Sequence, residues 1–393
     1  MTRRTPRPGR DPLIAAALAL SLLLGVVTGA LGAALPLLRS AYGLDDGSGT
    51  ELVVLYNLGA LLAIVLCGIG PRRLLGRALP PALLLAFAGS SAGMALAPTW
   101  GLLCGFALVA GAGYGGLILH LNSYFAHPSR PRPALLLNVL HACFGAGATV
   151  GPLLVGQWGG TSGLLLVAGA LSLLLFRAAA ATGEPVDRPE GAAARRPSGP
   201  LLAVLALLAL LYAGVEAGIG ALESTHLTSS GYAPADAARA TALFWAGLTV
   251  GRLVLPVAAR RLHHPRLIGL CLLAATGALA ATLLGSLAPV AYGLAGLALA
   301  AVFPTALAWA NALLPDPHRV NSALLVANLV GSTVLPYLIG LAAAPGSRAT
   351  IPLALAGLTL LCGLTIAVAA RLARRPVPPA PRPAPHNELE TSP

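Results

Sequence analysis

One carboxylate lies deep inside a long apolar stretch of this chain. Glu216 stands in the run 200–223, where nearly every other residue is apolar or glycine. A charge at bilayer depth costs about 2.5–3.5 kcal/mol on insertion scales, so such a residue marks a pathway or a partner. Glu216 could bind a solute or exchange a proton; a protonated glutamate bonded to a neighbouring helix is the alternative. Glu223, on the same helical face, is expected to be a solvated residue at the mouth of the run.

Three other polar side chains could contact the same ligand. Trp245 should lie at a depth similar to that of Glu216, and its ring could stack on a sugar face, anchor at the interface or pack. Asn138 and His141 are three residues apart and therefore share a helical face. They could hydrogen-bond a ligand or titrate near neutral pH, or they could join neighbouring helices.

A further group of polar residues lies nearer the ends of the apolar runs. Arg252 could reach the surface or pair with an acceptor such as Asp316, and we favour this pairing as a gate contact. His120 and Asn122 suit a gating or structural role better than ligand contact. Asn328 is interpreted as a packing hydrogen bond.

Twelve apolar stretches of about 20 residues carry these side chains, and each is long enough to cross a ~30 Å hydrocarbon core. Continuous apolar runs without a period of two favour helices and exclude a β-barrel. The predicted fold is an all-α polytopic membrane protein with spans at 13–38, 50–69, 79–97, 101–124, 133–156, 161–180, 200–223, 236–258, 266–288, 289–313, 321–344 and 350–371.

Composition excludes several classes of protein. Charged residues make up 10% of the chain, against roughly 25% in a typical soluble domain. The net charge of +12 is spread over short loops, which favours contact with anionic headgroups over nucleic acid. All five cysteines fall inside spans, so neither a disulfide framework nor a metal site is expected. The clustered His, Asp or Cys of a membrane-embedded enzyme is missing, and no cofactor motif is found.

The arginines predict the orientation. Most lie in segments that share one side with the N-terminus, whereas the other side offers only Arg39, Arg239 and Arg348. The positive-inside rule therefore places both termini in the cytoplasm, with the protein in the cell membrane.

The chain divides into two similar halves. A linker at 182–199, rich in charged residues, Pro and Ala, separates a half at 13–181 from a half at 200–371. A cytoplasmic tail precedes the first half at 1–12, and a disordered cytoplasmic tail follows the second at 372–393. A fixed offset superimposes Gly32 on Gly220 and the triplet 72–74 (RRL) on 260–262 (RRL). A slightly shorter offset aligns the Gly/Pro/Gly spacing of 147–156 with that of 331–340.

Two six-helix halves around a cytoplasmic linker resemble the major facilitator superfamily. The turn 68–77 (GIGPRRLLGR) is similar to the superfamily signature between helices two and three, with an extra residue and without its usual aspartate. This resemblance implies that the halves rock about a central site near the midplane, which span seven helps to line. It places Glu216 at that site, and Arg72 and Arg73 at a gate.

A narrower resemblance points to the branch of fucose permeases and glucose/galactose transporters. It is carried by 138–152 (NVLHACFGAGATVGP), 212–220 (YAGVEAGIG), 244–252 (FWAGLTVGR) and 303–305 (FPT). Two positions depart from the branch: Ile118 replaces an acidic residue, and Leu222 replaces an aromatic one.

The resulting prediction is a secondary transporter, not an enzyme, that moves a small polar, sugar-like solute by alternating access as a monomer. Protons are a candidate coupling ion, because no nucleotide-binding loop is present. Efflux of a drug or metabolite is the alternative, and a non-transporting sensor of the same fold is a third possibility.

Overall fold

The computed structural model describes residues 12–45, 48–69, 78–126, 133–177, 199–258, 261–343 and 347–374. Within these ranges the secondary structure is helical and contains no strand. Each of the twelve predicted spans coincides with one helix or with a broken pair of helices, so the predicted all-helical fold is confirmed.

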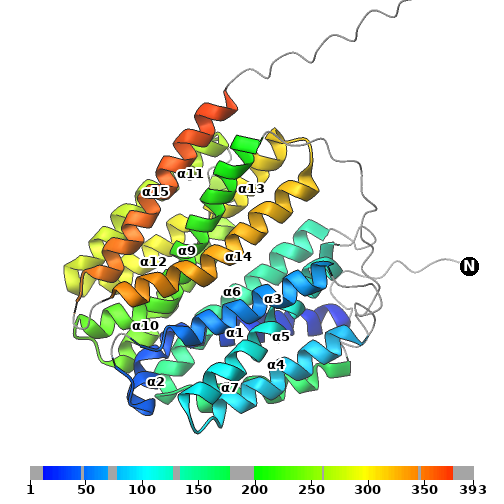
Figure 1. Ribbon diagram of the computed structural model, residues 1–393, viewed down its shortest axis with the longest axis vertical. Helices are drawn as coiled ribbons and strands as arrows, with labels where there is room; N and C mark the ends of the chain where they lie inside the picture. Colours follow the sequence, from blue (N-terminus) through cyan, green and yellow to red (C-terminus); the bar gives the residue numbers. More distant parts are fainter. Residues whose placement is uncertain are drawn as a thin grey trace, which may run out of the picture.

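The described residues of the first half form seven helices (Figure 1). They are α1 (Pro12–Ala33), α2 (Leu35–Tyr42), α3 (Glu51–Ile69), α4 (Leu79–Ala95), α5 (Trp100–Ala126), α6 (Pro133–Trp158) and α7 (Ser162–Leu174). The first span is broken at Ala34, just before Pro36, and α2 ends at Gly43, whose φ of 64° is in the left-handed region. That conformation favours glycine as a helix terminator.

The second half contains the remaining helices. They are α9 (Gly199–Ser229), α10 (Pro234–Ala258), α11 (His264–Ala281), the 3₁₀ segment η1 (Thr282–Leu287), α12 (Ala288–Leu299), α13 (Val302–Leu313), α14 (Pro317–Ala342) and α15 (Thr350–Ala373). The tenth span is split into α12 and α13 shortly before Pro304, a residue whose ring disfavours a continuous helix.

In the part of the chain that the structure describes, seven helices or helix groups are long and apolar enough to span a membrane by length and composition. Three shorter apolar helices, within α3, α4 and α7, accompany them. Many large apolar side chains are exposed on the outer surface, including Leu174, Leu273 and Leu364. Such a surface suits lipid contact rather than water.

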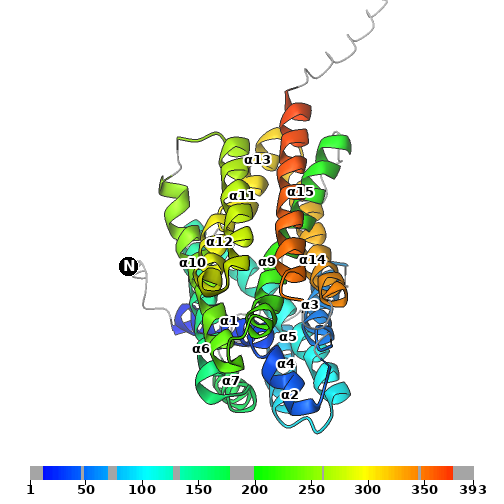
Figure 2. The same cartoon turned by 90° about the vertical axis from the view of Figure 1, so that its left-hand side faces the viewer.

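Two buried apolar clusters form the interior, and they follow the two halves of the sequence. One is built by α1–α7 around Leu24, Phe87 and Phe125; the other is built by α9–α15 around Leu205 and Phe244. In both views α14 lies beside α3 and α10 lies beside α6, so these pairs join the halves (Figures 1 and 2).

The halves cross most tightly where α1 meets α9. A Cβ atom added to Gly32 would overlap the carbonyl oxygen of Gly220, so the α1 backbone needs glycine at this crossing. These are the two glycines that the sequence repeat superimposes. The inter-helix approach of small residues stabilises helix pairs in membranes.

Hydrogen bonds also join the halves near this crossing. Ser224 Oγ donates to the Gly32 carbonyl at 2.9 Å, Arg39 Nη1 to Thr225 Oγ1 at 2.9 Å and Arg239 Nη2 to a carbonyl of α6 at 2.9 Å. All of them lie at the end of the bundle where α1 and α9 finish and α3 and α10 begin. We call it the closed end, and the opposite end, where α1 and α9 begin, the open end.

Candidate functional site

The carboxylate of Glu216 is held by an arginine from the next helix. Nη2 of Arg252 on α10 lies 3.1 Å from Oε1 of Glu216 on α9, and the Tyr212 hydroxyl donates to Oε2. The side chains of Glu216 and Arg252 are 21% and 32% exposed, so the pair lines an accessible space rather than a sealed core. Its opposite charges compensate each other, which lowers the cost of placing them inside the bundle.

Packing fixes the tyrosine that completes this group. Tyr212 lies one helical turn before Glu216 and is 2% exposed. Its ring stacks on Phe303 of α13, with centroids 6.0 Å apart and planes within 13°. The stacked ring holds the hydroxyl at the carboxylate, so the geometry of the acceptor is set before any ligand arrives.

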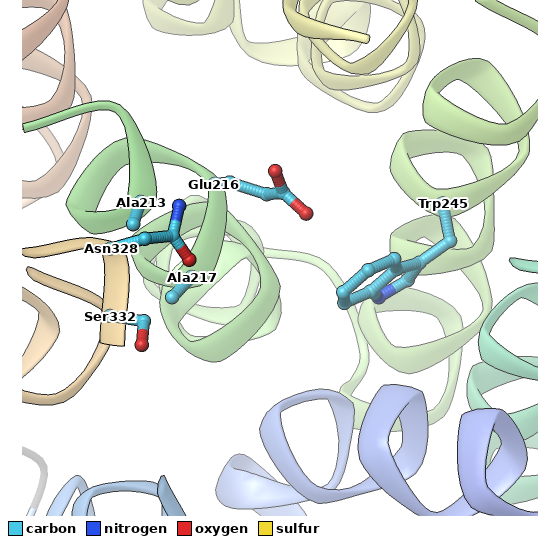
Figure 3. A pocket seen from close by; sticks show the side chains of 6 residues that line it. All are labelled: Ala213, Glu216, Ala217, Trp245, Asn328 and Ser332. Carbon is cyan, nitrogen blue, oxygen red and sulfur yellow. The ribbon is translucent and has the colours of Figure 1, made fainter. Parts of the chain in front are cut away.

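A small cavity opens beside Glu216. Ala213, Glu216 and Ala217 of α9, Trp245 of α10, and Asn328 and Ser332 of α14 line it. Figure 3 shows the Glu216 carboxylate and the Trp245 ring pointing toward each other across it.

The Trp245 indole has an unused hydrogen-bond donor. The residue is 8% exposed, and its Nε1 has no hydrogen-bond partner among the described residues. Gly220 makes room for this ring, because a Cβ there would lie 2.9 Å from Cζ2 of the indole. A buried N–H that lacks a protein partner is a candidate donor to a ligand.

The first half contributes an aromatic cluster that faces the charged pair. Tyr56 of α3 stacks on Tyr114 of α5 with ring centroids 5.3 Å apart, and the ring centroids of Tyr114 and Phe144 of α6 are 6.2 Å apart. Thr28 Oγ1 lies 3.2 Å from the Tyr56 hydroxyl. Tyr114 is close enough to Glu216 and Arg252 for electrostatic interaction. One aromatic ring of the first half, Tyr114, therefore lies near the ion pair of the second half.

A family model describes most of this chain. The model of the Major Facilitator Superfamily matches residues 17–319. The chain belongs to this superfamily. It is thus a multi-pass membrane protein and a transporter rather than an enzyme, as the sequence predicted.

Solved transporter structures share the fold. A bacterial homologue of the human lysosomal transporter Spinster, in an inward-facing and occupied conformation, superimposes with a TM-score of 0.72 at 16% identity, covering 95% of this chain and 100% of its own. The nucleoside transporter NupG gives a TM-score of 0.72 at 14% identity, covering 92% of this chain and 100% of its own. No curated protein sequence gives a significant match. The likeness to fucose permeases stays a prediction.

Of the four residues predicted to bind the solute, Glu216 and Trp245 lie together in the cavity. Asn138 and His141 are exposed on α6 and are not among the residues that line the cavity. His141 is close enough to Arg252 for their charges to interact. Asn328, interpreted from sequence as a packing residue, instead lines the cavity.

The predicted gate pairing of Arg252 with Asp316 is not what the structure shows. Arg252 pairs with Glu216, whereas Asp316 caps α14 by accepting from the Arg319 backbone N–H at 3.1 Å. A short acidic side chain before a proline at the first helical position is typical of such a cap. The long arginine side chain reaches toward the closed end, and the sequence did not fix that direction.

Two other predicted gate residues, His120 and Asn122, lie toward the open end. Asn122 donates to the carbonyl of Ile118 one turn earlier on α5 at 2.8 Å, and His120 is partly buried on the same helix. Arg72 and Arg73 lie outside the described residues.

The expectation that Glu223 is solvated at a mouth is wrong. The predicted span ended at this residue, but α9 continues to Ser229, so Glu223 is 0% exposed inside the second half. Glu216 is therefore not the sole carboxylate deep in a span.

Sequence reasoning also missed Tyr212 and Ser332 as site residues. Tyr212 is four residues before Glu216, and this spacing places both on one helical face and could have identified it. Ser332 follows Asn328 at the same spacing on α14, a signal of the same kind. The sequence gives no such signal for Tyr114, because its proximity to the Glu216–Arg252 pair depends on how the two halves pack against each other.

Proposed function

We propose that this transporter moves a small polar, sugar-like solute across the cytoplasmic membrane by alternating access. The solute binds in the cavity beside Glu216 and Trp245. The observation that carries the proposal is the compensated Glu216–Arg252 pair facing the Trp245 indole across that cavity, with an indole N–H that has no partner among the described residues. The pair can accept and donate hydrogen bonds, and because its two charges cancel it presents no net charge to the solute.

The lining supports a ring-shaped, hydroxyl-bearing solute. Trp245 offers a flat apolar face together with an N–H donor, while Asn328 and the Glu216–Arg252 pair offer both donors and acceptors. The Tyr114 ring belongs to the opposite half, so a solute held between the two walls would contact both halves. Such shared contacts allow binding to differ between the two states of a rocking carrier.

The contacts between the halves support one particular state. They gather at the closed end, where Gly32, Arg39 and Arg239 are tied to the opposite half. With both termini in the cytoplasm, as the arginines predict, this is an inward-facing state. We propose that Arg72, Arg73, His120 and Asn122 contribute to the gate at the other end.

Efflux of an apolar compound is the second candidate. The half-buried rings of Tyr114 and Phe144, with Ala213 and Ala217, form apolar surface near the polar groups. This surface favours a drug-like or lipophilic substrate over a sugar.

Counterflow in proteoliposomes tests the proposal. Vesicles are preloaded with an unlabelled sugar, nucleoside or lipophilic drug, and entry of the labelled compound is followed. Nucleosides are included because a nucleoside transporter shares the fold. We expect saturable exchange of a sugar that Trp245→Ala weakens and that Trp309→Ala, a buried tryptophan outside the cavity, leaves unchanged. Exchange of a drug alone would select the efflux alternative, and exchange of no compound would favour a sensor.

A further inference from the structure

Glu223 is a buried acid that the solute cavity does not use. It lies seven residues beyond Glu216 on α9, about 10 Å along the helix, and is 0% exposed. Neither carboxyl oxygen has a hydrogen-bond partner among the described residues. A carboxylate ion in such surroundings would be unfavourable, so the group holds a proton in this conformation.

A chain of hydrogen-bonding side chains leads toward this acid from the closed end. Ser230, partly exposed just beyond α9, has its Oγ 3.3 Å from Nε2 of His226. Nδ1 of His226 lies 2.9 Å from the Tyr292 hydroxyl of α12. His226 and Tyr292 are 1% and 0% exposed, so the chain runs from the rim into the interior.

The inner end of this chain lies beside the acid. His226 follows Glu223 at a spacing of three residues, which places both on one face of α9. Tyr292 is close enough to Glu223 for electrostatic interaction, yet the two are not hydrogen-bonded here. The chain is therefore interrupted at its last step in this conformation, and the proton on Glu223 is isolated.

The residues that follow Glu223 tie α9 to the opposite half. Ser224 donates to the Gly32 carbonyl, and Thr225 accepts from Arg39. If the closed end opens, both bonds break and the segment of α9 next to Glu223 separates from α1 and α2. The ionised form of Glu223 then becomes accessible, with the hydrogen-bonded chain as its link to external water.

Among the described residues, the charged and titratable groups around this site are few and mostly paired. They are His226 on α9 itself, Tyr292 on α12, and Arg39 on α2, bound to Thr225 and to a carbonyl of its own loop. On α10, Arg239 pairs with Asp236 at 2.6 Å. The backbone of Arg348 forms a hydrogen bond with the His226 side chain.

We propose that Glu223 is a proton-binding site, separate from the solute cavity, which the Ser230–His226–Tyr292 chain loads from the closed end. A proton from external water enters at Nε2 of His226 as the Nδ1 proton passes to the Tyr292 oxygen. The Tyr292 hydroxyl proton passes to the Glu223 carboxylate. One proton is taken up, the tyrosine is restored, and the histidine is left as its other neutral tautomer. Binding of this proton favours closure, because the closed conformation accepts only the neutral acid.

This inference rests on the proposed alternating-access function, but its test needs no solute. Spin labels at Thr99→Cys and Ser286→Cys, two exposed positions of the closed end in opposite halves, report the distance between the halves. The five native cysteines are replaced in the labelled protein. Double electron–electron resonance then follows this distance from about pH 5 to about pH 9, a range in which carboxylic acids displaced by burial titrate.

We expect the distance to lengthen with rising pH in the otherwise unchanged protein. Glu223→Gln, a neutral group of the same shape, should lose this shift and keep at pH 9 the short distance of pH 5. The matched control is Glu51→Gln, at the same end in the first half, where the carboxylate accepts from Trp100 Nε1 at 2.7 Å; it should keep the shift.

A second variant tests the loading chain. Tyr292→Phe removes the last hydroxyl, so the equilibrium shift should persist while relaxation after a pH jump slows about tenfold or more. An unchanged rate would overturn the chain as the route. A shift that survives in Glu223→Gln, or no shift in the starting protein, would overturn the site itself. Sugar counterflow is measured separately, so a failed site leaves the proposed transport intact, and failed transport leaves the pH result intact.

Discussion

Arg252 Nη2 lies 3.1 Å from Glu216 Oε1, joining a cation of α10 to an anion of α9 beside the cavity. Neither side chain belongs to a sealed core, since about a fifth and a third of their surfaces are exposed. The pair can therefore exchange one of its internal contacts for a contact with solute. It also couples two helices of the second half, so the site and the packing of this half depend on each other.

Breaking the pair from one side should cost more than removing both partners. Arg252→Met leaves the Glu216 carboxylate with only Tyr212, and we expect a loss of about 1–3 kcal/mol in unfolding free energy. Partial exposure keeps the loss below the ~3–5 kcal/mol of a fully buried pair. The double variant Glu216→Gln/Arg252→Met should recover part of it. Thermal unfolding in detergent measures this difference.

The control for this pair is Arg266→Met, an exposed arginine in the first turn of α11. Its removal should change stability by less than about 0.5 kcal/mol. Equal stability of the single and double variants of the pair would show that Arg252 and Glu216 do not act together.

The Trp245 N–H should contribute to solute affinity. Trp245→Phe keeps an aromatic ring but removes the donor, so we expect the KM of counterflow to rise about fivefold, equivalent to about 1 kcal/mol for one hydrogen bond. The maximal rate should change little. Trp309→Phe, buried in α13 outside the cavity, is the matched control. An unchanged KM in Trp245→Phe would assign this residue to packing.

The spans could be predicted because each is a continuous apolar run whose length matches a bilayer. The partners of the polar residues inside the spans were harder to predict, because they depend on the rotation of each helix about its axis and on the direction of each side chain. Arg252 was placed near the open end from its position in the run, yet its side chain extends back to Glu216. Hydropathy ended the seventh span at Glu223, because the polar residues 223–230 look like a loop. In the structure most of them are satisfied within α9 or across to α1 and α12.

Labelling can test the predicted orientation. Cys at Thr99, exposed at the closed end, should react with a membrane-impermeant maleimide from outside the cell. Cys at Arg374, exposed just beyond α15, should react only after the membrane is permeabilised. The parent protein gives the background from its five native cysteines, which lie in the helices. Reaction of both sites from one side would contradict the arrangement of the termini.

The crossing of α1 and α9 predicts that a single methyl group can open the closed end. A Cβ at Gly32 would meet the backbone of Gly220 and Ala221, which cannot rotate away as a side chain could. Overpacking of this kind costs about 1–3 kcal/mol. Because the strain exists only while α1 and α9 are in contact, Gly32→Ala should shift the population toward the conformation in which they separate.

Reactivity of a cysteine at this contact measures that shift. In Ser224→Cys, whose parent residue is 1% exposed, a water-soluble maleimide can react only when α1 leaves α9. A destabilisation of about 1–3 kcal/mol corresponds to a reaction faster by roughly 5- to 150-fold when Gly32→Ala is added. The control is Gly105→Ala on α5, where an added Cβ meets open space and should leave the rate unchanged. If Gly32→Ala and Gly105→Ala react at the same rate, the crossing does not hold the closed end together.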